Sequence, residues 1–149
     1  MKIGIASDHR GYDLKEKIKK ELEKEKISVV DYGTNSKEST DYPDYAFKLG
    51  EAVSNNEVDY GVAICGSGIG ISIACNKVKR VRCAKVSTEE EAKVTRNDNN
   101  SNIVAFGEKT SLEEALKIIK AFIETPFSKE EKHHRRVNKI IEYEDKYER

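Results

Sequence analysis

Short apolar runs alternate with charged, helical stretches along the whole chain. The apolar runs predict five strands, because each is brief and is bounded by polar or turn-like residues. These strands are expected over Ile3–Ala6, Ile27–Tyr32, Tyr60–Cys65, Val81–Val86 and Ile103–Phe106. The run Tyr60–Cys65 is apolar almost throughout, which indicates a strand covered on both faces of a sheet.

Between the strands, apolar residues recur every three to four positions among Lys and Glu, which predicts helices. Ser111 is placed to cap the N-terminus of one of them, and Glu114 three residues later completes a capping box. The helices are expected over Gly11–Lys26, Asp44–Ser54, a short segment through Ile73 and Ala74, Thr88–Thr95, Ser111–Ile123 and roughly 129–147.

This order of elements predicts an α/β fold, a three-layer α/β/α sandwich with a five-stranded parallel, Rossmann-like sheet and right-handed crossovers. A chain of 149 residues suits one domain, 1–149. The last helix, about 129–147, carries a narrow apolar stripe under a high density of charge. Two interpretations of it stay open: a solvated helix packed at one edge, or an arm that crosses to a partner subunit.

Composition excludes several classes of protein. The 27 Lys and Arg residues balance the 27 Asp and Glu residues, which argues against a nucleic-acid partner. No apolar run approaches the roughly 20 residues that span a bilayer, so no membrane partner is expected. Cys65, Cys75 and Cys83 form no C-x-x-C pair and cannot all pair internally, which predicts a cytoplasmic location. The Cys and His spacing is not that of metal ligands, and we expect neither a metal nor a cofactor.

Two loops carry most of the candidate chemistry. Ligands of open parallel sheets bind beyond the carboxyl ends of the strands, where successive connections diverge. In a sheet that begins 2-1-3, this rule brings together Ser7-Asp8-His9, after the first strand, and Cys65-Gly66-Ser67-Gly68-Ile69-Gly70, after the third. The second loop fits neither the dinucleotide fingerprint, because position 71 is Ile, nor a P-loop. Its glycines still allow backbone N–H groups to approach an anionic oxygen, of a phosphate or of an enolate.

Individual residues of these loops have a chemical and a structural interpretation. A helix N-terminus can lower the pKa of a thiol that precedes it, so Cys65 is a candidate base or nucleophile, or else a core cysteine. Cys75 and Cys83 are interpreted as packing residues. Asp8-His9 offers a carboxylate and an imidazole to the same crevice, or else a helix cap and a surface histidine. The cations of 132–136 suit a phosphate, or else form a solvated helix face.

The Asn-rich segment Asn97–Asn102 is predicted to be a loop that precedes the fifth strand. Within one subunit it would therefore lie at the opposite edge of the sheet from the glycine loop. If its side chains join the site, a second subunit must supply them, and a homodimer with sites at its interface is the simplest arrangement.

Six motifs, in order and with matching spacing, together resemble the ribose-5-phosphate isomerase B family, which also includes the galactose-6-phosphate isomerase subunits. They are SDHRGY at 7–12, DYGT at 31–34, TDYPDYA at 40–46, CGSGIGISIACNK at 65–77, RNDNNSNIVAFGE at 96–108 and HHRRV at 133–137. The resemblance covers nearly the whole chain. It implies a metal-free aldose–ketose isomerase that interconverts ribose 5-phosphate and ribulose 5-phosphate through an enediolate, in homodimers or homotetramers with sites between subunits.

The resemblance also implies roles for residues. Cys65 would be the base that moves a proton between C1 and C2. Ser67 and the N–H groups of Gly66, Gly68, Ile69 and Gly70 would hold the developing oxyanion. The other residues that it implies are Asp8, His9, Tyr42, Asn99, Lys109, Lys132 and Arg136 for substrate binding, and Asp98 at the position assigned to ring opening.

At that ring-opening position the chain departs from the family. It has Asp98-Asn99-Asn100 where the family commonly has His-Asn-Asp, and an ordinary aspartate is a poor acid at neutral pH. Two alternatives stay open: His9 or His133 assists the acid–base step, or ring opening is slow.

Other departures concern the charges around the substrate. Lys109 and Lys132 replace two arginines and lose their bidentate geometry, whereas Arg10 replaces a small residue and adds a guanidinium. Ser67 keeps the hydroxyl of the commoner Thr. Two other functions therefore stay open: an isomerase of a six-carbon sugar phosphate or a free aldose, and a sugar-phosphate-binding protein without catalysis.

Overall fold

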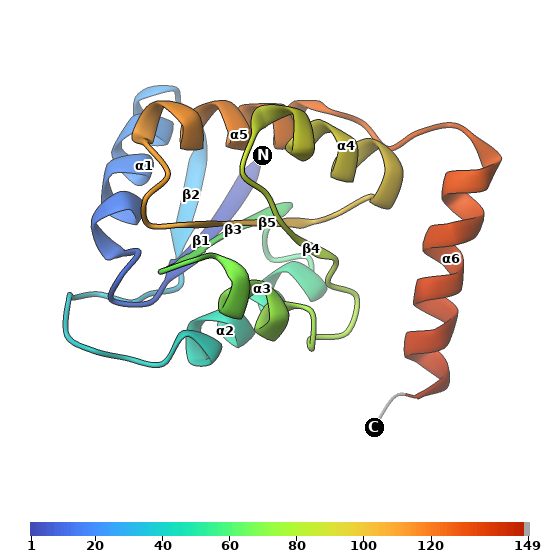
Figure 1. The fold of residues 1–149 in the computed structure, drawn as a ribbon, viewed down its shortest axis with the longest axis horizontal. Coiled ribbons are helices and arrows are strands. Elements are labelled where there is room, and N and C mark those ends of the chain that lie inside the picture. The colour runs from blue at the N-terminus through green and yellow to red at the C-terminus, as the bar shows by residue number, and fades with distance from the viewer. Residues whose placement is uncertain (148–149) are drawn as a thin grey trace.

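Five parallel strands form a single sheet in the order β2-β1-β3-β5-β4 in a computed structural model, which describes residues 1–147 (Figure 1). The strands are β1 (Lys2–Ser7), β2 (Ser28–Asp31), β3 (Tyr60–Cys65), β4 (Cys83–Lys85) and β5 (Ile103–Gly107). The helices are α1 (Tyr12–Lys24), α2 (Tyr42–Ser54), α3 (Ile69–Cys75), α4 (Glu89–Asn99), α5 (Leu112–Glu124) and α6 (Glu131–Lys146). Residues 148–149, the end of the predicted domain, lie outside the described part.

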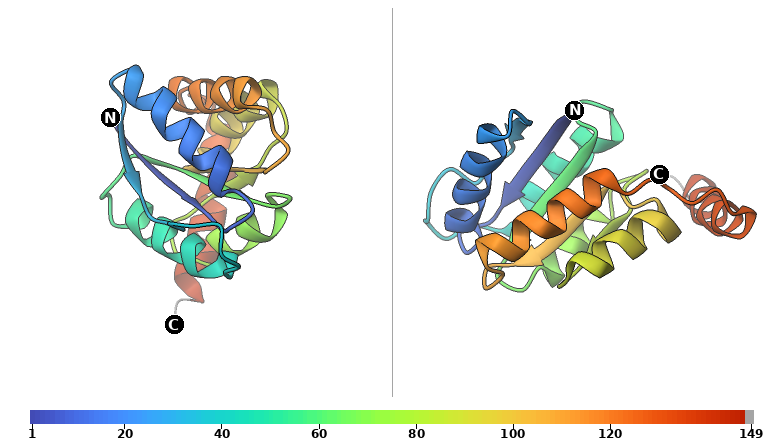
Figure 2. Two further views of the ribbon diagram at one scale, coloured as in Figure 1. Left: turned by 90° about the vertical axis from the view of Figure 1, so that its left-hand side faces the viewer. Right: turned by 90° about the horizontal axis from the view of Figure 1, so that it is seen from above.

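The predicted three layers are confirmed. Helices α1, α4 and α5 cover one face of the sheet, while α2 and α3 cover the other (Figure 2). Alternate residues of the central strands supply the two cores, so that Ile5 of β1 packs under α1 and α5, whereas Ala6 packs under α2 and α3. Because both faces are covered, β3 is apolar along its length, as its sequence indicates.

The prediction of a loop over Asn97–Asn102 is wrong for its first half, because α4 continues to Asn99. Two arginines from outside this segment bind the carbonyl groups that directly follow the helix. Arg82 Nη2 donates to Asn100 O at 2.9 Å, and Arg96 Nη1 donates to Ser101 O at 2.7 Å. Asn100, whose φ of 48° is left-handed, is the C-cap residue directly after the helix.

The other boundaries differ by a few residues. The edge strand β4 covers three residues instead of the predicted six, and pairs only with β5. Helix α2 begins two residues early, at Tyr42, with Pro43 in its first turn. The cap at Ser111 is confirmed, since the Glu114 N–H donates to its hydroxyl at 3.1 Å.

Helix α6 stands beside the sandwich rather than on it (Figure 1). Its buried residues, His133 and Val137, belong to its first half. Its second half is joined to the body by polar contacts, of which one is a 2.7 Å hydrogen bond from Arg80 N to Glu144. A groove lies between this half, helix α2 and the turn 76–79 that follows α3, and it is lined in part by Phe47 and Tyr143. Within residues 1–147, no helix is long and apolar enough to cross a membrane.

Candidate active site

The two predicted loops meet at the carboxyl edge of the sheet, as expected. Strands β1 and β3 are parallel neighbours, with Ser7 in register with Ile64. The Asp8 N–H donates to Ile64 O at 3.3 Å, which ties the first loop to the end of β3. The order 2-1-3 therefore places Asp8 and His9 beside the loop that begins at Cys65.

Cys65 is 4% exposed, and its thiol lies within the core under α2 and α3. The Gly68 N–H donates to Cys65 Sγ at 3.2 Å, so a backbone dipole points at the sulfur. This donor stabilises negative charge on the sulfur. At Cys75, a hydrogen bond with Cys83 and burial raise the pKa far above that of an ordinary thiol. The packing interpretation of Cys75 agrees with this environment.

Gly68 gives the loop its shape. Its φ of 80° is in the left-handed region, and an added Cβ would lie 2.6 Å from the backbone carbon of Phe106. No other residue fits such a conformation at so short a distance from β5. Gly68 thus has two roles: its N–H donates to Cys65, and it is the N-cap residue of helix α3.

The N–H groups of this loop are not all directed at a ligand. In addition to the Gly68 N–H on Cys65, the Ile69 N–H donates to Ser67 Oγ at 3.1 Å. Ser67 is exposed, and its hydroxyl, which accepts from Ile69, keeps its own proton to donate. Of the amides predicted to hold an oxyanion, Gly68 and Ile69 are therefore engaged within the loop, and Ser67 gains importance as a donor.

Tyr42 lies against the same loop. As the first residue of α2, it is 38% exposed, and its ring covers Gly70. A Cβ at position 70 would lie 2.7 Å from Tyr42 Cζ, so only glycine admits the ring here. The structure therefore brings Tyr42, predicted from its motif alone, to the edge of the crevice.

Asp8 and His9 are both fixed by backbone groups. Asp8 is 5% exposed and one oxygen of its carboxylate accepts from the N–H groups of Arg10 and Gly11, at 3.0 and 3.1 Å, before α1 begins. Asp8 therefore fixes the turn that leads into α1, but the helix-cap interpretation is wrong, because the N-cap residue of α1 is Gly11 and no side chain caps it. The Thr40 N–H donates to His9 Nδ1 at 3.2 Å. In the neutral imidazole, this acceptor role leaves the ring proton on Nε2.

Arg10 crosses the mouth of the crevice. Its Nε lies 2.5 Å from Glu108 Oε2, and its side chain covers Gly66. The guanidinium expected from the sequence is therefore present, with its charge paired. Glu108 was not predicted as a site residue, although its place directly after β5, next to Lys109, puts both at this edge of the sheet.

A second group of predicted residues lies at the amino edge of the sheet. Gly61 N, at the start of β3, donates to Asn102 O at 2.9 Å, which places the end of α4 there. Asp98 and Asn99 belong to this end of α4, and exposed Lys132 and Arg136 to the neighbouring first turns of α6. Within one chain, the structure does not bring these four residues to Cys65.

In this second group, a histidine lies close to Asp98, a contact that the sequence does not reveal. His133 Nε2 lies 3.7 Å from Asp98 Oδ1, and the His133 side chain is 10% exposed against 43% for Asp98. Asn97 Nδ2 donates to the same Asp98 oxygen at 2.8 Å. Asp98 therefore faces outward with an imidazole directly behind it. His9, the other alternative to the missing family histidine, lies at the opposite edge of the sheet.

The fold and site define a class: an α/β protein with a cysteine and a glycine loop at the switch point of its parallel sheet. Residues 3–140 match the Ribose/Galactose Isomerase family. Ribose-5-phosphate isomerase B of Escherichia coli is 39% identical over 146 residues, covering 97% of this chain and 97% of that protein.

Solved structures give the same result. Ribose-5-phosphate isomerase B of Clostridium thermocellum is 46% identical, with a TM-score of 0.95 over 99% of this chain and 100% of that chain. The enzyme of Mycoplasma genitalium with bound ribulose-5-phosphate is 39% identical, with a TM-score of 0.89 over 97% and 96%. The chain belongs to the Ribose/Galactose Isomerase family, and the resemblance of its motifs is confirmed.

Proposed function

We propose that the chain interconverts ribose 5-phosphate and ribulose 5-phosphate. The observation that carries this proposal is the buried Cys65 sulfur, held by the Gly68 N–H at the carboxyl edge of the sheet beside Asp8 and His9. Aldose–ketose isomerisation needs a base beside C1 and C2 and a donor for the oxygen that becomes negative, and this crevice contains both. Relatives named for the same reaction along the full chain support the choice of substrate.

In this mechanism the Cys65 thiolate removes the proton from C2 of the open-chain aldose. The electron pair moves to form the enediolate, and the proton is returned to C1 while a proton passes from O2 to O1. The Ser67 hydroxyl and the remaining loop amides stabilise the enediolate oxygen, which is the kind of electrostatic support that lowers such barriers most. No step requires a metal or an organic cofactor.

Substrate binding falls to residues around this centre. Asp8 accepts from sugar hydroxyls through the carboxylate oxygen that does not bind the Arg10 and Gly11 N–H groups, and Tyr42 closes the side of the pocket above Gly70. The Nε2–H of His9 and the Lys109 ammonium are suited to the phosphate.

The remaining residues come from a second copy of the chain in this proposal. Asn99, Lys132 and Arg136 lie at the amino edge, and one chain cannot deliver them to its own Cys65. A homodimer in which α6 crosses to its partner would do so, which favours the arm interpretation of this helix. Its position beside the sandwich, with Ile140 52% and Tyr143 67% exposed, supports this choice (Figure 2). We also propose a cytoplasmic location, supported by the three free thiols.

Ring opening is assigned to Asp98, with His133 as the group that orients it. The furanose must lose the proton of its C1 hydroxyl as the bond between C1 and the ring oxygen breaks and that oxygen is protonated. Asp98 accepts the hydroxyl proton and returns it to the ring oxygen as the bond to C1 breaks, while the His133 imidazole, 3.7 Å behind the carboxylate, limits its movement. The pair thus stands in for the single histidine common in the family.

Because the pair acts as a unit, Asp98→Asn and His133→Gln should each lower kcat for ribose 5-phosphate at least about ten-fold. The kcat of the double variant should be no lower than that of the slower single variant. His134→Gln is the matched control, since His134 contacts the Ser128 carbonyl and the Phe127 ring instead. Steady-state kinetics on the four variants decides the point. Additive losses, or a parent rate in His133→Gln, would contradict the pairing.

The substrate is tested by a panel of five- and six-carbon aldoses, each with and without phosphate. We expect the highest kcat/KM with ribose 5-phosphate. A preference for a six-carbon phosphate or a free aldose would mean that Asp98, Lys109 and Lys132 mark a changed specificity. Binding without turnover of any sugar would indicate a sugar-phosphate-binding protein.

A further inference from the structure

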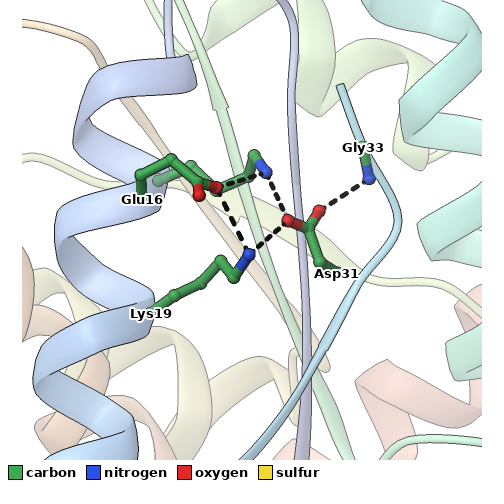
Figure 3. A network of polar contacts seen from close by, with 5 residues as sticks. Glu16, Lys19, Asp31 and Gly33 are labelled. Atoms are coloured by element: carbon green, nitrogen blue, oxygen red, sulfur yellow. Dashed lines mark hydrogen bonds and ion pairs between the residues drawn. The ribbon is translucent and has the colours of Figure 1, made fainter. Parts of the chain in front are cut away.

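A fully buried lysine lies behind the first site loop. Lys15 of α1 has no exposed side-chain surface, although a lysine is almost never buried unless it is paired. Its Nζ lies 2.5 Å from Asp31 Oδ2 and 3.0 Å from Glu16 Oε2, and Lys19 approaches the same two carboxylates (Figure 3). Replacing a buried ion pair by apolar residues is often neutral or stabilising, so stability alone explains this lysine poorly.

Asp31 connects the two lysines to the backbone at Gly33. While Oδ2 takes the two lysines, Oδ1 accepts from the Gly33 N–H at 2.8 Å (Figure 3). Burial alone would raise the pKa of Asp31, but the bonds from Lys15, Lys19 and Gly33 outweigh it and lower the pKa, so the group stays a carboxylate. The result is a turn at Gly33 fixed from behind by a charged side chain.

This turn is bonded to the strand that carries the site. Gly33 O accepts from the Ser7 N–H, and the Thr34 N–H donates to Ser7 O, each at 2.7 Å. Gly33 has a φ of 102°, which only glycine adopts readily. Ser7 directly precedes Asp8 and His9, so the position of the turn sets the position of the loop.

A second path leads from the turn to the His9 ring. The hydroxyls of Thr34 and Thr40 both hydrogen-bond to Tyr45 Oη, the latter at 3.0 Å, and these bonds lower the pKa of Tyr45. The Thr40 N–H then donates to His9 Nδ1 at 3.2 Å. One phenol thus ties both ends of segment 34–40, whose middle, 35–39, is exposed, and holds the amide that meets the imidazole.

We propose that Lys15 and Tyr45 are positioning residues for His9. Together they hold the imidazole in one orientation and one tautomer, with Nδ1 on Thr40 and the Nε2–H directed to an anionic group of the ligand. Neither residue touches the ligand in this proposal. The identity of the anion as a sugar phosphate rests on the proposed function, whereas the state of the His9 ring does not.

Tyr45→Phe tests the second path, because it removes only the hydroxyl. In the parent at pH 8, the imidazole nitrogens of His9 should report the Nε2–H tautomer alone by ¹⁵N NMR, and in Tyr45→Phe both tautomers should appear. KM for ribose 5-phosphate and the inhibition constant of inorganic phosphate should both rise roughly five-fold, as expected for one lost hydrogen bond, with kcat unchanged. Tyr32→Phe, two residues before segment 34–40 and with its hydroxyl outside this chain of bonds, should match the parent.

Lys15→Met tests the buried end, since it removes the charge and keeps most of the stem. We expect the same mixture of His9 tautomers and the same rise in KM without a change in kcat, measured well below the melting temperature. Lower stability with an unchanged His9 ring and unchanged KM would make Lys15 purely structural and overturn its role. A parent tautomer in Tyr45→Phe would overturn the role of Tyr45. If the parent isomerises no sugar, the proposed function fails, while the NMR and phosphate measurements still decide this inference.

Discussion

Cys65→Ala should lower kcat for the isomerisation of ribose 5-phosphate by about 10³-fold, because it removes the only group assigned to carry the proton between C2 and C1. The fold should survive, since alanine suits the buried position next to the core of α2 and α3. The rate is followed by the appearance of ribulose 5-phosphate, and far-ultraviolet circular dichroism checks the fold. KM should change little, because the thiol contributes to the reaction more than to binding.

Cys83→Ala is the matched control. Cys83 is a partly buried cysteine on the edge strand β4, and its backbone N–H and carbonyl are held by Asn76 whatever its side chain. Its substitution should leave kcat unchanged. If Cys65→Ala turned over at the parent rate, the base would have to lie elsewhere in the crevice, and the assigned mechanism would be wrong.

Of the glycine-to-alanine substitutions in the site loop, Gly68→Ala should lower stability and activity the most. The substitution forces a left-handed φ of 80° on a residue with a Cβ and drives that Cβ to 2.6 Å from the Phe106 backbone. Together, the conformational cost and the overpacking should lower the free energy of unfolding by about 2–4 kcal/mol. The displaced loop would also withdraw the N–H from Cys65, so kcat should fall as well.

Gly66→Ala in the same loop provides the comparison. A Cβ there would meet only the flexible Arg10 side chain, at 3.2 Å or more, and the free energy of unfolding should stay within about 1 kcal/mol of the parent. Urea unfolding of the two variants measures the difference. Equal stability of Gly68→Ala and Gly66→Ala would show that the loop relaxes freely, and that its contact with β5 does not fix the site.

The carboxyl-edge half of the site could be predicted because its residues follow strands directly. Once the order 2-1-3 is assumed, Asp8 and Cys65 must lie close together, because each directly follows or ends one of two neighbouring parallel strands. The strands themselves follow from local runs of apolar residues. The motif that contains Tyr42 was likewise enough to select it, although its contact with Gly70 was not foreseen.

The rest depends on contacts between distant segments. Asn97–Asn99 has the composition of a loop, and its composition does not reveal the bonds that Arg82, from a distant segment, and Arg96 make with the carbonyl groups directly after the helix. Lys15 precedes Ile18 and Leu22 by three and seven positions, so the helical period places it on the apolar face of α1, and its burial there depends on a partner from a distant segment, Asp31 of β2. The approach of His133 to Asp98 depends in the same way on how α6 packs against α4.

The central claim is that this chain moves a proton between adjacent carbons of a sugar phosphate, and deuterium exchange measures that step directly. The parent protein is incubated with ribose 5-phosphate in D₂O containing a chelator, and the sugar is examined by NMR. We expect deuterium at C2 of ribose 5-phosphate and at C1 of ribulose 5-phosphate, and none beyond background with Cys65→Ala. Stabilisation of the fold by ribose 5-phosphate with no deuterium incorporated would contradict the account.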